Sequence, residues 1–222
     1  MTRTLSVWVG AEIIYLYGTV NGEATTFTLV GAGEWQAVVP RAEDDNYVLH
    51  LEAYSANGLE GTYNYTLYYG MMPCITDRSQ DDVRRVKELN AKGWEAMTEA
   101  ERTEWLDGLK GAYNVSDLNR VGHNVAYLAD VLADLGHIVS VEPKTDWAAE
   151  DIPTQSQMAT YLSNVQALKE GFYGTIDLPE TMDQLTVEGA NNIERLLCEI
   201  EQNIRNLIEA WYYCGELYCG EV

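Results

Sequence analysis

Thr62-Tyr-Asn-Tyr-Thr-Leu-Tyr-Tyr69, followed at once by Gly70-Met71-Met72-Pro73-Cys74, is the stretch that decides the fold. Before it, short runs rich in β-branched and aromatic residues lie between Gly and Asn residues, a pattern typical of pleated strands. After Pro73, apolar residues recur three and four positions apart, as on amphipathic helices. We therefore predict an α+β protein of two domains, with a β domain over 1–70, a short linker over 71–75 and an all-α domain over 76–222.

Six short strands and three turns are predicted in the first domain. Asn21-Gly22 favours a two-residue type I′ turn, so the strands on either side of it should form a hairpin. Further turns are expected around Ala32-Gly33 and over Ser55-Ala-Asn-Gly58. Strands at this spacing predict an antiparallel β-sandwich whose two sheets each bury one face. The predicted strands are Leu5–Val9, Ile13–Val20, Thr25–Val30, Trp35–Val39, Tyr47–Tyr54 and Thr62–Tyr69.

Three segments of this domain resemble bacterial and phage immunoglobulin-like domains. They are Thr25-Thr26-Phe27, Trp35-Gln36-Ala37 and the run from Leu51 to Gly58. The resemblance implies an Ig-like β-sandwich. Because that fold carries many functions, it indicates how a surface is presented and no particular activity.

Five helices are predicted in the second domain, and they should form a helical bundle with three main members. Thr98-Glu-Ala-Glu101 has the spacing of a capping box, which marks the start of the second helix. The other boundaries come from caps, glycines and apolar spacing. The first helix opens at Asp81 and Asp82 and ends near Gly93, the second ends at Gly111, the third runs from Asn114 or Ser116 to Gly136, the fourth from Thr154 to Gly171, and the fifth from Thr186 to about Tyr212.

Charge and cysteine usage restrict the partners and the compartment. The formal net charge is -21, and residues 1–70 hold 2 basic and 8 acidic side chains against 12 and 27 in the rest, so both domains are acidic. Such surfaces repel phosphate, which argues against nucleic acid and anionic membranes as partners. No run has the length of a signal-peptide core or a membrane span, so we expect no membrane insertion. The spacing of Cys74, Cys198, Cys214 and Cys219 fits neither a disulfide scaffold nor a zinc site, which predicts a reducing compartment.

Catalytic, metal-binding and cofactor-binding residues are not predicted. With 35 carboxylates in the chain, Glu43-Asp44-Asp45, Asp81-Asp82 and the pair Glu99 and Glu101 are expected to be solvated faces or caps. A structural calcium ion at Asp44-Asp45-Asn46 stays open as an alternative, although the spacing lacks the ligands of an EF-hand. His50, His123 and His137 have no partner at motif spacing. We therefore predict that the chain is not an enzyme and binds no cofactor.

Tyrosines in the strands are the first candidate interaction surface. Tyr15 and Tyr17 share one face of their strand, while Ile14, Leu16 and Val20 share the other. In the last strand, Tyr68 lies opposite Tyr63, Tyr65 and Tyr69. One face of each strand must be core, so an exposed aromatic strip over Tyr15, Tyr17 and Tyr68 is one interpretation. Such a strip would stack on sugars or pack against protein. The alternative is a tyrosine-rich core or a closed domain joint.

The last residues hold a second candidate surface. Aromatic residues are concentrated at Trp211, Tyr212, Tyr213 and Tyr218, close to the end of the chain. They either pack back on the helices or form a self-association or docking surface. Asp117, Asn119 and Arg120, in the first turn of the third helix, are expected to fix a neighbouring loop through charge-assisted hydrogen bonds. A partner site is the alternative for these three residues.

A family resemblance extends over six segments, 75–80, 87–94, 97–101, 104–114, 117–121 and 210–222. Together they resemble a family of proteins encoded in the tail-gene regions of Firmicutes phages and prophages, in which an Ig-like module commonly precedes a helical one. The resemblance implies a non-enzymatic virion component, associated with the tail, its fibre or the baseplate, and assembled in the host cytoplasm. It implies other virion proteins and further copies of the chain as partners. A carbohydrate- or host-surface-binding adhesin and a head-decoration protein are the alternatives.

Overall fold

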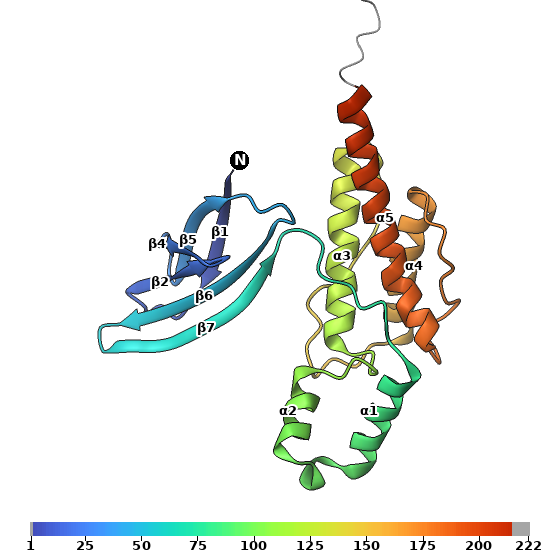
Figure 1. Cartoon of the computed structure of the whole chain (residues 1–222), viewed down its shortest axis with the longest axis horizontal. Coiled ribbons are helices and arrows are strands. Elements are labelled where there is room, and N and C mark those ends of the chain that lie inside the picture. Colours follow the sequence, from blue (N-terminus) through green and yellow to red (C-terminus); the bar gives the residue numbers. More distant parts are fainter. Residues whose placement is uncertain (1, 215–222) are drawn as a thin grey trace, which may run out of the picture. The chain divides into compact units, whose positions relative to one another are not determined.

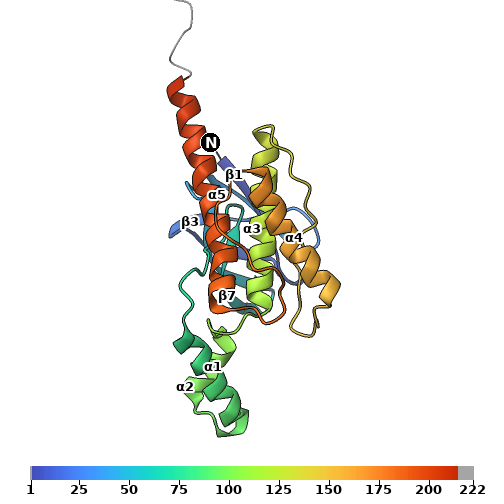
Figure 2. The same ribbon diagram turned by 90° about the vertical axis from the view of Figure 1, so that its right-hand side faces the viewer.

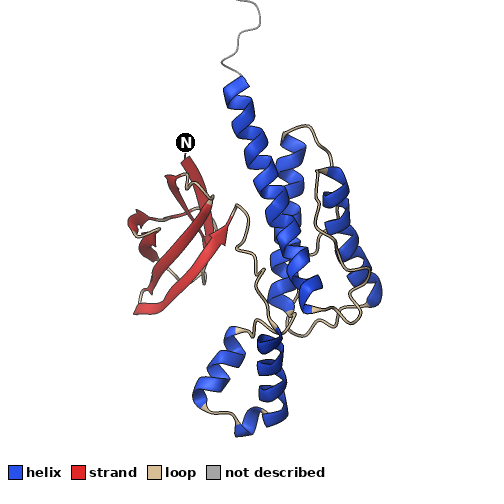
Figure 3. Cartoon of the chain, turned by 45° about the vertical axis from the view of Figure 1, so that its right-hand side comes forward, coloured by secondary structure: helices blue, strands red, loops and turns tan. Residues whose placement is uncertain are grey.

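The chain folds into two compact units that meet between Met71 and Met72. The structure, a computed structural model, describes residues 2–214, and it describes side chains up to Ala210. All described strands belong to the first unit and all described helices to the second, which we call the β unit and the helical unit (Figures 1 and 3). The mixed α+β class predicted from the sequence is confirmed.

The β unit contains two antiparallel sheets, one of three strands and one of four. The turn at Asn21-Gly22 forms as predicted. Both residues take positive φ angles, 51° and 83°, and Val20 pairs with Glu23 across the turn. The three-stranded sheet has the order β1 (Thr2–Trp8), β5 (Glu34–Pro40), β4 (Thr28–Leu29), and the four-stranded sheet has the order β3 (Glu23–Thr26), β2 (Tyr15–Val20), β6 (Asn46–Ser55), β7 (Gly58–Tyr68).

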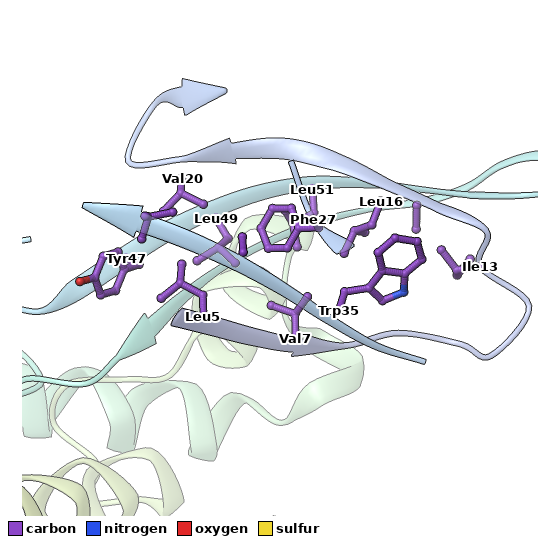
Figure 4. Packing of buried hydrophobic residues seen from close by; sticks show 13 residues of the cluster. Leu5, Val7, Ile13, Leu16, Val20, Phe27, Trp35, Tyr47, Leu49 and Leu51 are labelled. Atoms are coloured by element: carbon purple, nitrogen blue, oxygen red, sulfur yellow. The ribbon is translucent and has the colours of Figure 1, made fainter. Parts of the chain in front are cut away.

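One hydrophobic core joins the two sheets. Alternate side chains of β6 are fully buried at Leu49 and Leu51, and they meet Leu5 and Val7 of β1 and the indole of Trp35 (Figure 4). This strict alternation is the period-two pattern of strands with one face in the core. The opposite face of the four-stranded sheet is therefore free to carry polar and aromatic groups.

Two predictions about strands are wrong. Thr25–Val30 is not one strand, because Phe27 turns into the core and divides it into β3 and β4, which belong to different sheets. Ile14 is half exposed, and its neighbour Ile13 is the buried residue. The reason is that β2 begins only at Tyr15, so the alternation does not extend back to Ile14.

A buried carboxylate corrects the interpretation of the acidic run Glu43-Asp44-Asp45 as solvated. Asp45 is buried and takes a left-handed backbone conformation with φ 53°. Its carboxylate oxygens accept hydrogen bonds from Arg3, from Arg41 at 2.8 Å and from the Tyr47 hydroxyl at 2.9 Å. This carboxylate therefore connects the start of β1 with the loop before β6.

Five α-helices and one 3₁₀ helix are described in the helical unit. Four of the α-helices begin with a complete capping box, at Ser79, Thr98, Asn114 and Thr154, which satisfies the first free amides of each helix. The second helix ends at Asp107 and not at Gly111, because Gly108 already leaves the helical conformation with φ 92°. The elements are α1 (Gln80–Lys92), the 3₁₀ helix η1 (Trp94–Ala96), α2 (Glu99–Asp107), α3 (Val115–Asp134), α4 (Gln155–Gly171) and α5 (Val187–Cys214).

The three long helices α3, α4 and α5 pack against one another (Figure 2). Each contributes a stripe of buried residues at the predicted three- and four-residue spacing. On α3 the stripe includes Val121, Val125 and Leu128, and on α5 it includes Ile193 and Leu197. This core is separate from that of the β unit.

Candidate functional site

The outer face of the four-stranded sheet carries three neighbouring tyrosine rings, two of them exposed and the third, Tyr54, half-buried. Tyr15 and Tyr17 are 55% and 53% exposed, whereas Leu16 between them is buried. The rings of Tyr15 and Tyr17 are stacked, with centroids 6.0 Å apart, and the ring of Tyr54 meets that of Tyr17 edge to face at 6.1 Å. Register explains this arrangement, because Tyr15 is the cross-strand partner of Tyr54.

Polar groups continue the same face beside the rings. Glu52 is the cross-strand partner of Tyr17 and accepts a hydrogen bond from the Tyr54 hydroxyl at 2.7 Å. That hydrogen bond to a carboxylate raises the pKa of Tyr54 above its usual value, so the phenol stays protonated. Further along β6, His50 Nδ1 lies 2.7 Å from the Asn64 Oδ1 of β7.

We call these six residues, Tyr15, Tyr17, Tyr54, His50, Glu52 and Asn64, the tyrosine face. It combines aromatic rings with a carboxylate, an imidazole and an amide on one sheet surface. Tyr54 and Glu52 did not emerge from the sequence as site residues. These two residues lie beside Tyr15 and Tyr17 because β2 pairs with β6, and the paired residues are far apart in the sequence.

Tyr68 lies on this side of the sheet but away from the tyrosine face. It pairs with Asn46, whereas Tyr15 pairs with Tyr54, eight residues further along β6. At ~3.3 Å per residue the two sites are ~26 Å apart. The three predicted strand tyrosines therefore do not form one strip.

The remaining tyrosines of β7 point to the other side of the sheet. Tyr63 and Tyr65 pair with the buried Leu51 and Leu49. Burial raises the pKa of Tyr65 to about 12. Tyr69, just beyond the strand, packs against the core. The alternative prediction of tyrosines packed in a core therefore applies to Tyr69, whereas Tyr15 and Tyr17 are exposed.

The predicted aromatic surface near the end of the chain lies outside the described part. The structure does not describe the side chains of Trp211, Tyr212 and Tyr213, and Tyr218 lies outside the described residues.

In the helical unit, the segment 72–78 is bound along α3 and α5, and we call it the docked segment. Asn124 of α3 accepts a hydrogen bond from the Met72 amide at 2.7 Å and donates one to its carbonyl at 3.0 Å. Asn191 of α5 makes the same pair of bonds to Arg78, at 3.0 and 2.9 Å. Figure 1 shows this segment passing alongside α3 before α1 begins. The residues predicted as a linker are therefore part of the helical unit from Met72 onward.

A buried group of four charges holds the middle of the docked segment. Glu194 is fully buried and accepts from Arg78 at 2.6 Å, from Arg120 at 2.8 Å and from the Ile75 amide at 2.8 Å. Asp117 accepts from Arg78 at 2.7 Å and also from Arg120. Two guanidinium groups thus face two carboxylates, and the charges balance.

This arrangement has the properties of a structural cluster. The Glu194 oxygens are already occupied by guanidinium and amide donors, so neither is poised to take a proton from a substrate. The prediction that Asp117 fixes a neighbouring segment is confirmed by its bond from Arg78, whereas Arg120 bonds to Asp117 and to Glu194 of α5. Asn119 does the same for another segment, since its amide accepts from the Trp147 backbone amide at 2.8 Å and donates to its carbonyl at 2.9 Å.

A pocket of about 250 Å³ lies between α3, α4 and the segment 142–147. Its lining includes Val121, Val125, Trp147 and the Lys144 side chain. The Lys144 ammonium donates to Asp146 at 2.7 Å and lies over the Trp147 ring. The pocket therefore presents mainly apolar surface, with its ammonium group already engaged.

Searches for similar proteins identify no relative. No protein-family model matches the chain, and neither a curated protein nor a solved structure matches it. Among the side chains of residues 2–210, no three His, Cys, Asp or Glu groups are placed so that they could hold a metal ion. No described helix is both long enough and apolar enough to cross a membrane.

Proposed function

We propose that this chain is a non-enzymatic structural component of a phage virion, associated with the tail, its fibre or the baseplate. In this proposal the β unit is an Ig-like β-sandwich that presents the tyrosine face, and the helical unit is a bundle that anchors the chain to other virion proteins. The observation that supports it best is the stacked, exposed pair Tyr15 and Tyr17 on a sheet whose other face is core. The location in the virion tail is proposed from the resemblance to phage tail-region proteins.

The role of the tyrosine face follows from the energetics of aromatic surfaces. Tyrosine offers a large rigid contact area with a hydroxyl that binds water or a partner equally well. Exposed stacked rings stabilise the fold less than buried ones, because their outer surfaces stay hydrated. A surface of this kind is characteristic of recognition sites.

Localisation on particles tests the virion proposal. Antibodies raised against the purified chain, coupled to gold, would be applied to particles released by the bacterium that encodes it. Label on the tail, fibre or baseplate is the expected result. Label confined to the head would indicate a head-decoration protein instead. Intact particles without label, alongside chain present in the cell extract, would refute the proposal.

Self-association is part of the same proposal and needs a separate measurement. Size-exclusion chromatography with light scattering on the full chain should show an oligomer whose population rises with concentration. Because the formal net charge of -21 opposes association, added salt should favour the oligomer. A strict monomer at every concentration and salt level would exclude assembly through copies of this chain.

A second candidate function is carbohydrate binding by the tyrosine face. It is favoured by Glu52, His50 and Asn64, which lie beside the rings as hydrogen-bonding partners for sugar hydroxyls. Sugars have apolar C–H faces that stack on aromatic rings and hydroxyl edges that bind carboxylates and amides. The tyrosine face offers both kinds of group on one surface.

Glycan arrays followed by calorimetry on any positive glycan test this candidate. Replacing Tyr17 by Ala should weaken binding by about 2- to 12-fold, since one ring contact contributes about 0.5–1.5 kcal/mol. Tyr63→Ala is the matched control, because Tyr63 is also exposed but lies on the other side of the sheet. Carbohydrate recognition by this face would be excluded if no glycan on the array bound the chain, or if Tyr17→Ala and Tyr63→Ala changed the affinity equally.

A further inference from the structure

We propose that Cys74 and Cys198 are a redox-active thiol pair, which closes to a disulfide in the presence of a low-molecular-weight disulfide and covalently joins the docked segment to α5. This inference depends on the geometry of the helical unit and not on the proposed function.

The register between the docked segment and α5 brings the two cysteines together. Arg78 is bonded to Asn191, and Ile75 is bonded to Glu194, so the segment runs antiparallel to the helix. Residues 191, 194 and 198 lie on one side of α5, because helical positions three and four apart share a face. Cys198 is thus one turn beyond Glu194, next to the residue that precedes Ile75.

Contacts of the thiols agree with this register. The Cys74 and Cys198 thiols lie close enough for each to shift the pKa of the other. The Asn124 amide that holds Met72 also approaches Cys74 Sγ, at 3.6 Å. Both thiols are free and half-buried, so small reagents have partial access to them. The docked segment therefore places two reduced thiols beside each other.

The pair is chemically asymmetric. The hydrogen bond from Cys74 lowers the pKa of Cys198 below its usual value, despite opposing effects of burial and of Glu201 and Glu194. The same bond, together with burial, raises the pKa of Cys74. Because the thiolate is the nucleophile in exchange, Cys198 is the attacking residue and Cys74 the resolving one.

The reaction proceeds in two exchange steps. The Cys198 thiolate attacks one sulfur of oxidised glutathione, which breaks the glutathione disulfide, forms a mixed disulfide and releases one glutathione thiolate. Cys74 then loses its proton to the solvent, attacks the Cys198 sulfur and releases the second glutathione. The two protein thiols are oxidised, one glutathione disulfide is reduced, and the two protein protons end on the two released thiols.

Closure of this bond should stabilise the helical unit. The two cysteines lie in the docked segment and the last helix, so the disulfide encloses most of the unit and restricts its unfolded state strongly. In reducing conditions the segment is held by hydrogen bonds and ion pairs alone. Oxidation adds a covalent bond without moving the chain to a new register.

The test uses the full chain carrying Cys214→Ser and Cys219→Ser, so that only the two proposed thiols remain. It is equilibrated in glutathione buffers from fully reducing to fully oxidising, then alkylated and analysed by peptide mass spectrometry. The expected result is a monomeric cross-link between the peptides that contain Cys74 and Cys198, fully reversed by dithiothreitol. The thermal midpoint of the helical unit should rise by ~5–10 °C on oxidation.

A further substitution, Cys198→Ser, is the control. It should remove both the cross-link and the shift in midpoint, while circular dichroism confirms that the helices are intact. In the unsubstituted chain, oxidation should give the same cross-linked peptides. Two alkylatable thiols in fully oxidising buffer, persistent mixed disulfides with glutathione, or cross-links only between different molecules would overturn the proposal.

Discussion

Replacing Glu194 by Ala should destabilise the helical unit by about 3–5 kcal/mol, the range observed when one partner of a buried ion pair is removed. Glu194 is fully buried, and the other side chains of the cluster, Arg78, Asp117 and Arg120, are 3%, 4% and 10% exposed. After the substitution, Asp117 alone would face two guanidinium groups, and the Ile75 amide would lose its acceptor. A simple sum over the lost hydrogen bonds would overestimate the effect, because water entering the space would satisfy some of the donors.

Urea unfolding followed by far-ultraviolet circular dichroism measures this effect, since nearly all of the helical signal comes from this unit. Glu201→Ala is the matched control on the same helix, because Glu201 pairs with Arg205 at the surface and should contribute less than about 1 kcal/mol. Amide hydrogen exchange of β6, which reports the β unit, should be unchanged. Equal losses for the two substitutions, or a loss below about 1 kcal/mol for Glu194→Ala, would refute the description of a buried, charge-balanced cluster.

Two further predictions concern a glycine in a strand and a carboxylate in a cap. Gly18→Ala should destabilise the β unit by about 1–3 kcal/mol, measured by amide hydrogen exchange of β6, since an added Cβ would lie 2.1 Å from the His50 carbonyl oxygen; exchange equal to that of the native chain would contradict the close approach of β2 to β6. Glu101 should titrate at about 2 by carbon NMR, because its hydrogen bonds from Lys92 and from the Thr98 amide hold its pKa below the ordinary 4.5. The carboxylate is the form that these bonds favour, so its contribution to α2 is complete above pH 4.5 and is lost as the pH falls toward 2. Lys92→Ala should move the midpoint upward, and an unchanged midpoint would show that the Lys92 bond is absent in solution.

Local signals in the sequence were sufficient for most of the secondary structure. The turn at Asn21-Gly22 and the capping box at Thr98 depend on residues within a few positions of each other, and both formed as predicted. The division at Phe27 was missed because a strand that changes sheets keeps its β-type composition on both sides. The composition of Thr25–Val30 is visible in the sequence, but only the packing of Phe27 shows that β3 and β4 belong to different sheets.

The candidate sites were harder to predict because their partners lie far apart in the chain. Tyr15 and Tyr17 were found from period-two spacing, yet Tyr54 joins them only through the register of β2 on β6. Similarly, Arg78 and Glu194 are separated by 116 positions and belong to no motif. In a sequence with many carboxylates, nothing marks the one that will be buried. Because the buried partners of the docked segment could not be identified, the segment was predicted as a linker.

Asparagine side chains bind non-helical segments to helices at three places. Asn119, Asn124 and Asn191 each bond to both the backbone N–H and the backbone carbonyl of one residue. This use of both ends of the side chain makes each of the three positions intolerant of an exchange of Asn for Asp. Spontaneous deamidation would turn the amide that donates to the carbonyl into a second carboxylate oxygen, and so place negative charge against it. The long-term integrity of this unit thus depends on three side-chain nitrogens, which neither Asp nor an apolar residue of similar size can replace.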